Sequence, residues 1–66
     1  MKILVNGKEI TVEEGINIEQ LLDKMKLTQK RLAVEINQAI IPASSHSKHI
    51  IKAQDKVEIV QAIGGG

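Results

Sequence analysis

The chain has 66 residues, no cysteine and a formal net charge of +1, so it suits one small domain and excludes disulfides and thiolate metal sites. Scattered charges and the absence of Phe, Tyr and Trp argue against nucleic acid as a partner. Because no apolar run is long enough for a signal peptide or a membrane span, we expect a cytoplasmic protein that does not bind membranes.

The first predicted element is a β-hairpin that turns at Asn6-Gly7. A two-residue type I′ turn needs positive φ at both positions, and Asn-Gly tolerates this best. With this turn, Ile3 faces Ile10 across the hairpin, and both lie on one apolar face with Val12. The opposite face is polar except for Leu4.

A short amphipathic helix is predicted after the hairpin. Asn17 is a favourable N-cap, and Gln20 completes a capping box with it. The apolar residues of this segment recur at helical spacing and form one stripe: Ile18, Leu21, Leu22 and Met25. We expect a helix of about ten residues that covers one face of a sheet.

Three strands are predicted after the helix. Residues 32–37 alternate, with Val34 and Ile36 on the buried face. Residues 39–41 form a short strand that Pro42 stops, and residues 56–61 alternate again as the last strand. The loop of residues 43–48 is polar.

This order of elements predicts an α+β fold in which one helix packs across a mixed sheet of four or five strands. The economical arrangement is a β-grasp, in which the first and last strands pair in parallel at the sheet centre. We therefore divide the chain into a β-grasp domain at residues 1–61 and a flexible C-terminal tail at residues 62–66.

The tail ends in Gly64-Gly65-Gly66. Because glycine has no side chain, a narrow cleft can close around this backbone and leave the terminal carboxylate free to react. At roughly 3.3 Å per residue, the residues beyond Gln61 could carry the carboxylate up to about 17 Å, far enough to enter another protein's active site. We predict that the Gly66 carboxylate is the working group and that a partner recognises Ile63, Gly64 and Gly65.

Several features together resemble the ThiS-type sulfur carrier proteins of thiamine biosynthesis, which have a ubiquitin-like β-grasp fold. They are the Asn6-Gly7 hairpin, residues 33–37 followed by Ile41-Pro42, the strand of residues 55–60 and the closing Gly65-Gly66. The resemblance covers the whole chain.

Three positions depart from the pattern of that family. A basic residue is common where Ala43 stands, an aromatic residue where His46 stands, and glycine where Gln54 stands. None of these positions lies in the tail, so they bear on partner contacts more than on the chemistry of the C-terminus.

The resemblance implies that this chain is a carrier and not an enzyme. In such a system an E1-like adenylating enzyme uses ATP and magnesium to convert the Gly66 carboxyl group into an acyl-adenylate. A persulfide protein then supplies sulfur, and the resulting thiocarboxylate donates it to a thiazole synthase. The carrier itself binds no cofactor, since ATP and Mg are used by the activating partner.

A docking site for the activating enzyme is expected on the outer face of the sheet. With Val57 and Ile59 buried, Val60 shares that face with Leu4, and parallel pairing of the first and last strands would make Leu4 and Val60 neighbours. These two would form a small aliphatic patch beside the tail. An ordinary scatter of surface aliphatic residues is an equally good interpretation.

Other interpretations stay open. The carrier could serve molybdopterin or another sulfur pathway, the chain could be a ubiquitin-like modifier conjugated through Gly66, or it could be a passive binding module. His46 and His49 have a spacing that could share a metal, but no carboxylate cluster completes a site, and we expect both to be surface loop residues.

Overall fold

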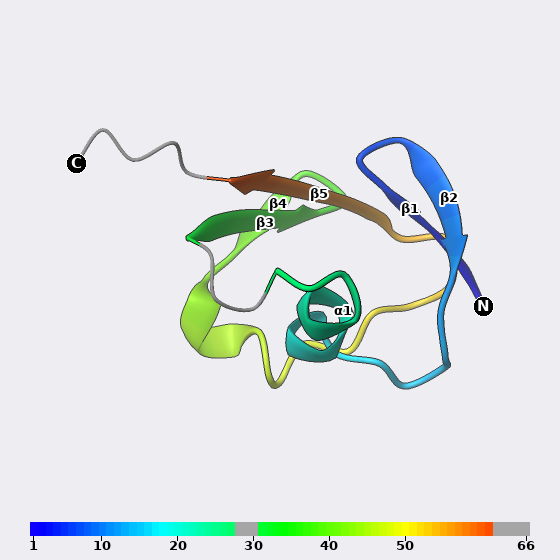
Figure 1. The fold of residues 1–66 in the computed structure, drawn as a ribbon, viewed down its shortest axis with the longest axis horizontal. Coiled ribbons are helices and arrows are strands. Elements are labelled where there is room, and N and C mark those ends of the chain that lie inside the picture. Colours follow the sequence, from blue (N-terminus) through cyan, green and yellow to red (C-terminus); the bar gives the residue numbers. More distant parts are fainter. Residues whose placement is uncertain (28–30, 62–66) are drawn as a thin grey trace.

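The computed structural model describes residues 1–27 and 31–61. Its elements, in chain order, are β1 (Lys2–Val5), β2 (Lys8–Thr11), α1 (Ile18–Lys24), β3 (Leu32–Ile36), β4 (Ala39–Ile41), the 3-10 turn η1 (Ala43–Ser45) and β5 (Lys56–Gln61). The strands form one five-stranded sheet in the order β2-β1-β5-β3-β4, and α1 packs across one face of it (Figure 1).

The sheet is mixed, as predicted. β1 and β5 pair in parallel at its centre, while the other neighbouring strands pair antiparallel. The predicted register of the first hairpin is confirmed, because Ile3 faces Ile10 and the turn residues Asn6 and Gly7 have φ angles of 51° and 82°. Local turn chemistry therefore determines this hairpin.

Helix α1 begins as predicted but is shorter than expected. The Asn17 side chain accepts a hydrogen bond from the Gln20 amide at 2.7 Å, and the Gln20 side chain accepts one from the Asn17 amide at 2.9 Å. The helix ends at Lys24 because Lys26 adopts a φ of 61°. The Leu27 amide then bonds to the Leu22 carbonyl at 2.8 Å, which completes a Schellman motif.

The core lies between α1 and the inner face of the sheet. Its aliphatic side chains come from both layers and from the segments that join them: Ile3, Val5, Val12, Ile16, Ile18, Leu21, Leu22, Val34, Ile36, Ile51, Val57 and Ile59. The core is therefore packed with aliphatic side chains, in keeping with the absence of aromatic residues from the sequence. No helix among the described residues is long and apolar enough to cross a membrane.

The loop after β4 differs from the prediction. His46 is only 8% exposed, and its Nε2 lies 3.1 Å from the Ile41 carbonyl oxygen. The expectation of a surface histidine was wrong because η1 folds the loop back against α1, where the Glu19 amide bonds to the His46 carbonyl at 3.3 Å. His49, by contrast, is half-buried.

Candidate functional site at the end of β5

The predicted working residues follow β5 directly. Gly66 and the recognition residues Ile63, Gly64 and Gly65 lie outside the described residues, so the site is built from the strand that precedes them. β5 is the central strand of the sheet, and it reaches Gln61 before the tail begins (Figure 1).

The two sides of β5 are paired to different lengths. On one side β3 accompanies β5 along its length, from the Ile36–Val57 pair to the Leu32–Gln61 pair. On the other side the strand pairing with β1 covers only Leu4–Lys56 and Val5–Val57. Beyond Val57 the strand on that side has already turned away at Asn6 and Gly7.

A side chain continues the hydrogen bonding where β1 stops. The Asn6 amide donates to the Val57 carbonyl at 2.9 Å, and the Asn6 side chain then bonds to both backbone groups of Ile59. Its Oδ1 accepts from the Ile59 amide at 2.8 Å, and its Nδ2 donates to the Ile59 carbonyl at 3.2 Å. Asn6 therefore replaces one further residue of β1.

A second asparagine anchors the beginning of β5. The Asn37 amide donates to the Lys56 carbonyl at 2.8 Å, and the Asn37 Oδ1 accepts from the Lys56 amide at 2.9 Å. Its Nδ2 donates to Asp55 at 3.0 Å. The sequence predicted a turn at Asn6 and placed Asn37 at the end of the strand of residues 32–37, and no signal in the local pattern indicated which strand their side chains would contact.

The predicted docking residues share a face but are not neighbours. Val60 is 58% exposed on the outer face, and Leu4 is half-buried on the same face. The register pairs Leu4 with Lys56, which is four residues before Val60, or about 13 Å along the strand. The expected contact between Leu4 and Val60 was therefore wrong, because pairing with β1 involves only the beginning of β5.

Other apolar side chains lie closer to Val60. Ala33 stands directly opposite it on β3 and is exposed. Ile40, which is 73% exposed, faces Glu35 across β4 and β3 and so shares this outer face. We call Val60, Ala33 and Ile40 the outer apolar patch. Docking of the activating enzyme on this face, at Val60 and Leu4, stays a prediction.

The sequence model of the ThiS family matches residues 2–66 of the chain. The chain belongs to the ThiS family. Among proteins similar to it is the sulfur carrier protein ThiS of Escherichia coli, which is 32% identical over 66 residues and is matched along all of both chains.

Solved structures agree with the ThiS family assignment. The crystal structure of the thiamine biosynthesis protein ThiS from Geobacter metallireducens is similar with a TM-score of 0.87 and 33% identity over the whole of both chains. This similarity, together with the sheet order and the helix, confirms the predicted ubiquitin-like β-grasp fold.

A ThiS-like segment also occurs inside longer proteins. The thiazole synthase of Paramagnetospirillum magneticum is 38% identical to this chain over 66 residues. The chain spans 20% of the length of that protein and 20% of a second thiazole synthase, from Magnetococcus marinus.

Proposed function

We propose that this chain is a cytoplasmic sulfur carrier of thiamine biosynthesis that acts as a thiocarboxylate on Gly66. The observation that carries the proposal is the match to the ThiS family over residues 2–66, which includes the terminal glycines. The position of β5 supports it, because the tail follows the central strand of the sheet, which pairs with β3 along its length and with β1 at its beginning.

The Gly66 carboxylate is a poor electrophile and must be activated before sulfur can be added. An E1-like adenylating enzyme binds ATP and Mg, and a Gly66 carboxylate oxygen attacks the α-phosphorus of ATP to give an acyl-adenylate and pyrophosphate. The terminal sulfur of a persulfide protein then attacks the acyl carbon and expels AMP. A thiol cleaves the resulting acyl disulfide and leaves the thiocarboxylate. All of these catalytic groups belong to the partners, so the chain is a co-substrate that binds no cofactor.

A thiazole synthase is the proposed acceptor of the sulfur. Two proteins named thiazole synthase contain a segment similar to this whole chain, which supports an encounter between the two activities. Joining a carrier to its acceptor in one polypeptide raises their effective concentration, and such fusion is favourable when the two must meet in every cycle.

Intact mass tests the proposal. The chain is incubated with the adenylating enzyme encoded in the same genome, with ATP, Mg and a sulfide source. We expect a mass gain equal to the exchange of one oxygen for sulfur, and no gain for a chain that lacks Gly66. Lysine-linked conjugates would instead support a ubiquitin-like modifier.

A truncated chain provides the control for folding. A chain that ends at Gln61 retains every residue of the described core, so we expect its unfolding midpoint to lie within about 2 °C of the full chain. If this folded chain gains no sulfur, the loss reflects the missing tail, which carries the Gly66 carboxylate, and not unfolding of the domain. If the full chain gains no sulfur while the enzyme charges another carrier, the proposal is rejected.

A further inference from the structure

The backbone of β5 presents alternate residues to its two sides. Val57 and Ile59 direct their hydrogen-bonding groups toward β1, where Asn6 binds them, while Lys56 directs its groups toward Asn37 at the end of β3. Since the direction repeats every second residue, the N–H and C=O of Gln61 point to the same side as those of Ile59.

In the described part of the chain, that side of Gln61 is an open strand edge. β1 ends at Val5, and the Asn6 side chain reaches Ile59 but goes no further. Within residues 1–27 and 31–61, no group on this side forms a hydrogen bond with the Gln61 backbone. Gln61 is also exposed. Among the described residues, β5 is therefore hydrogen-bonded on both sides up to Ile59, and at Gln61 it pairs only with β3.

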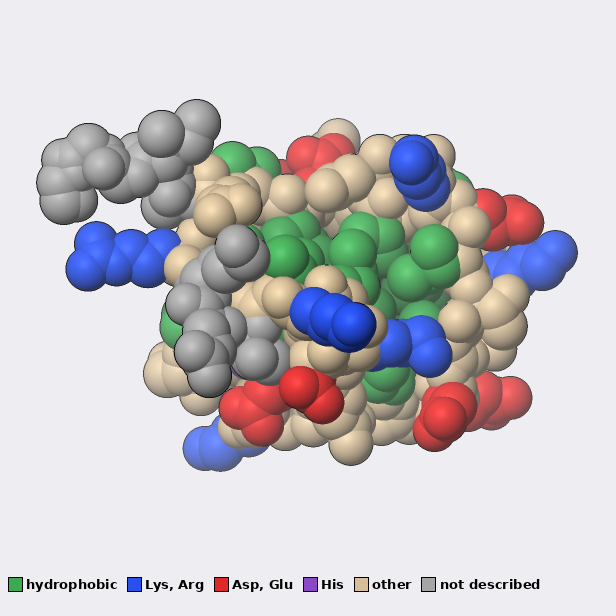
Figure 2. Space-filling model, viewed as in Figure 1, with side chains coloured by type: hydrophobic (Ala, Val, Ile, Leu, Met, Phe, Trp, Pro, Cys, Tyr) green, Lys and Arg blue, Asp and Glu red, His purple; other side chains and the backbone are tan. Residues whose placement is uncertain are grey.

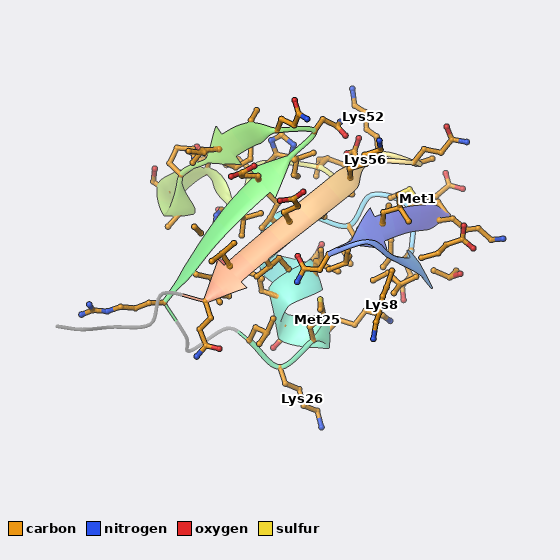
Figure 3. The ribbon with its side chains drawn as sticks, turned by 90° about the horizontal axis from the view of Figure 1, so that it is seen from above. Met1, Lys8, Met25, Lys26, Lys52 and Lys56 are labelled. Carbon is orange, nitrogen blue, oxygen red and sulfur yellow. The ribbon has the colours of Figure 1, made fainter. Side chains whose placement is uncertain are left out.

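Apolar side chains are found on the side of β5 to which this edge faces (Figure 2, Figure 3). Met25 and Leu27, which follow α1, are half-buried and pack against the core. Figure 2 shows exposed hydrophobic side chains between the sheet and α1, with lysine or arginine side chains in front of them. In Figure 3, Met25, Lys26 and Lys8 lie on the β1 side of β5. A segment that runs along this side of β5 would therefore approach the apolar side chain of Met25 and the positive charges of Lys26 and Lys8 (Figure 3).

We propose that the adenylating enzyme adds an extended segment to this edge, along the line of β1 beyond Asn6. The backbone of that segment pairs with the N–H and C=O of Gln61, its inward side chains are apolar and cover Met25 and Leu27, and acidic side chains flank it near Lys8 and Lys26. This inference rests on the proposed function. Pairing at Gln61 would fix the position from which the tail enters the enzyme's active site. Gly66 then lies at most about 17 Å from Gln61.

Replacement of Gln61 by proline tests the pairing. Proline removes the N–H that faces the open edge, and such a position tolerates proline because the groups of β5 that face β3 at this end belong to Val60, which pairs with Ala33. Gln61→Ala is the matched control, since it shortens the side chain and keeps the N–H. We expect Gln61→Pro to bind the purified adenylating enzyme with ATP and Mg about 5- to 20-fold more weakly, and Gln61→Ala to bind within about twofold of the wild type.

Amide hydrogen exchange in the unmodified chain provides a readout that does not depend on a variant. In the free protein we expect the Gln61 amide to exchange much faster than the Val60 amide, which faces β3. On addition of the enzyme, we expect exchange at Gln61 to slow by about tenfold or more.

Two results separate this inference from the proposed function. If the chain gains sulfur but the Gln61 amide exchanges at the same rate in the complex, strand addition is overturned and the carrier function stands. Equal affinity of the proline and alanine variants, with both folded, overturns it in the same way. If no sulfur is gained at all, the proposed function fails and this inference fails with it.

Discussion

Single residues in the left-handed region show where the chain carries local strain. Gln38 and Gln54 have φ angles of 73° and 68°, which residues other than glycine tolerate poorly. Gln38 is the second turn residue between β3 and β4, and the same position between β1 and β2 is occupied by Gly7, with a φ of 82°. Gln54 is also the position at which the ThiS-type pattern has glycine, and its backbone angle supplies the physical reason for that preference.

Gln54→Gly should therefore stabilise the fold. Glycine relieves a left-handed conformation that costs about 1–2 kcal/mol but adds about 0.5–1 kcal/mol of unfolded-state entropy, so we expect a net gain of about 0.5–1 kcal/mol. The Gln54 amide keeps its 2.8 Å bond to the Lys2 carbonyl. Urea unfolding followed by circular dichroism measures the change, because the chain has no Trp or Tyr to report fluorescence.

Gln54→Ala is the matched control for this gain. It removes the same side chain but keeps a Cβ at positive φ, so it should not increase stability. Equal stabilisation by glycine and alanine would show that the side chain, and not the backbone angle, causes the effect.

At the scale of elements, the two asparagine contacts explain how a short sheet holds its central strand. Asn37 fixes the beginning of β5 and Asn6 fixes Ile59 near its end. Both asparagines lie in tight turns with a φ of 51°, a conformation that asparagine tolerates better than most residues. One residue type therefore makes the turn and also extends the sheet.

Asn6→Gly tests how much the hydrogen bonds between the Asn6 side chain and the Ile59 backbone contribute to stability. Glycine preserves the positive φ but removes both hydrogen bonds to Ile59, and we expect a loss of about 1–3 kcal/mol in unfolding free energy. Hydrogen exchange adds an internal comparison, because the Ile59 amide should lose protection while the Lys56 amide, held by Asn37, changes less. Wild-type stability together with wild-type protection at Ile59 would contradict this role for Asn6.

Elements with local signals were predictable from the sequence. The hairpin at Asn6-Gly7 and the start of α1 at Asn17 depend on neighbouring residues, and both are confirmed. The end of α1 was not predicted, because Lys26 takes the left-handed position that glycine usually marks.

Features set by distant segments were beyond local reasoning. The register between β1 and β5, which separates Leu4 from Val60, depends on how the whole chain returns to the sheet centre. The burial of His46 depends on a 3-10 turn that packs a polar loop against α1. The Gly66 carboxylate therefore stays a prediction from the sequence, whereas the arrangement of the surface around the end of β5 was not predictable from local patterns.

At the scale of the whole molecule, the sheet has one covered face and one exposed face. The inner face packs on α1 and carries the core, whereas on the outer face the described elements leave Val60 and Ile40 exposed. Beside them Glu35 and Glu58 stand directly opposite each other, and like charges in such a pair are unfavourable in the free protein. An enzyme surface with apolar and positively charged groups would relieve both features.

We propose that the E1-like adenylating enzyme docks on this outer face, with Val60 at the centre of the contact and Leu4 at its margin. Val60→Glu should slow the gain of sulfur by about tenfold, since a contact centred on an apolar anchor loses about 1–2 kcal/mol or more when the anchor becomes charged. Val60→Lys distinguishes the loss of the apolar contact from the effect of the introduced charge. If Val60→Glu and Val60→Lys slow the gain of sulfur by a similar factor, the lost apolar contact is the cause.

The matched control lies on the far edge of the same face. Thr11 is exposed on β2, so Thr11→Glu should leave the rate within about twofold of the wild type. Leu4→Glu should have a smaller effect than Val60→Glu, because the register places Leu4 about 13 Å along the sheet from Val60. If folded Val60→Glu gains sulfur at the normal rate, the activating enzyme does not use this face, and its contact with the carrier must lie on the edge beside Gln61 or on the tail alone.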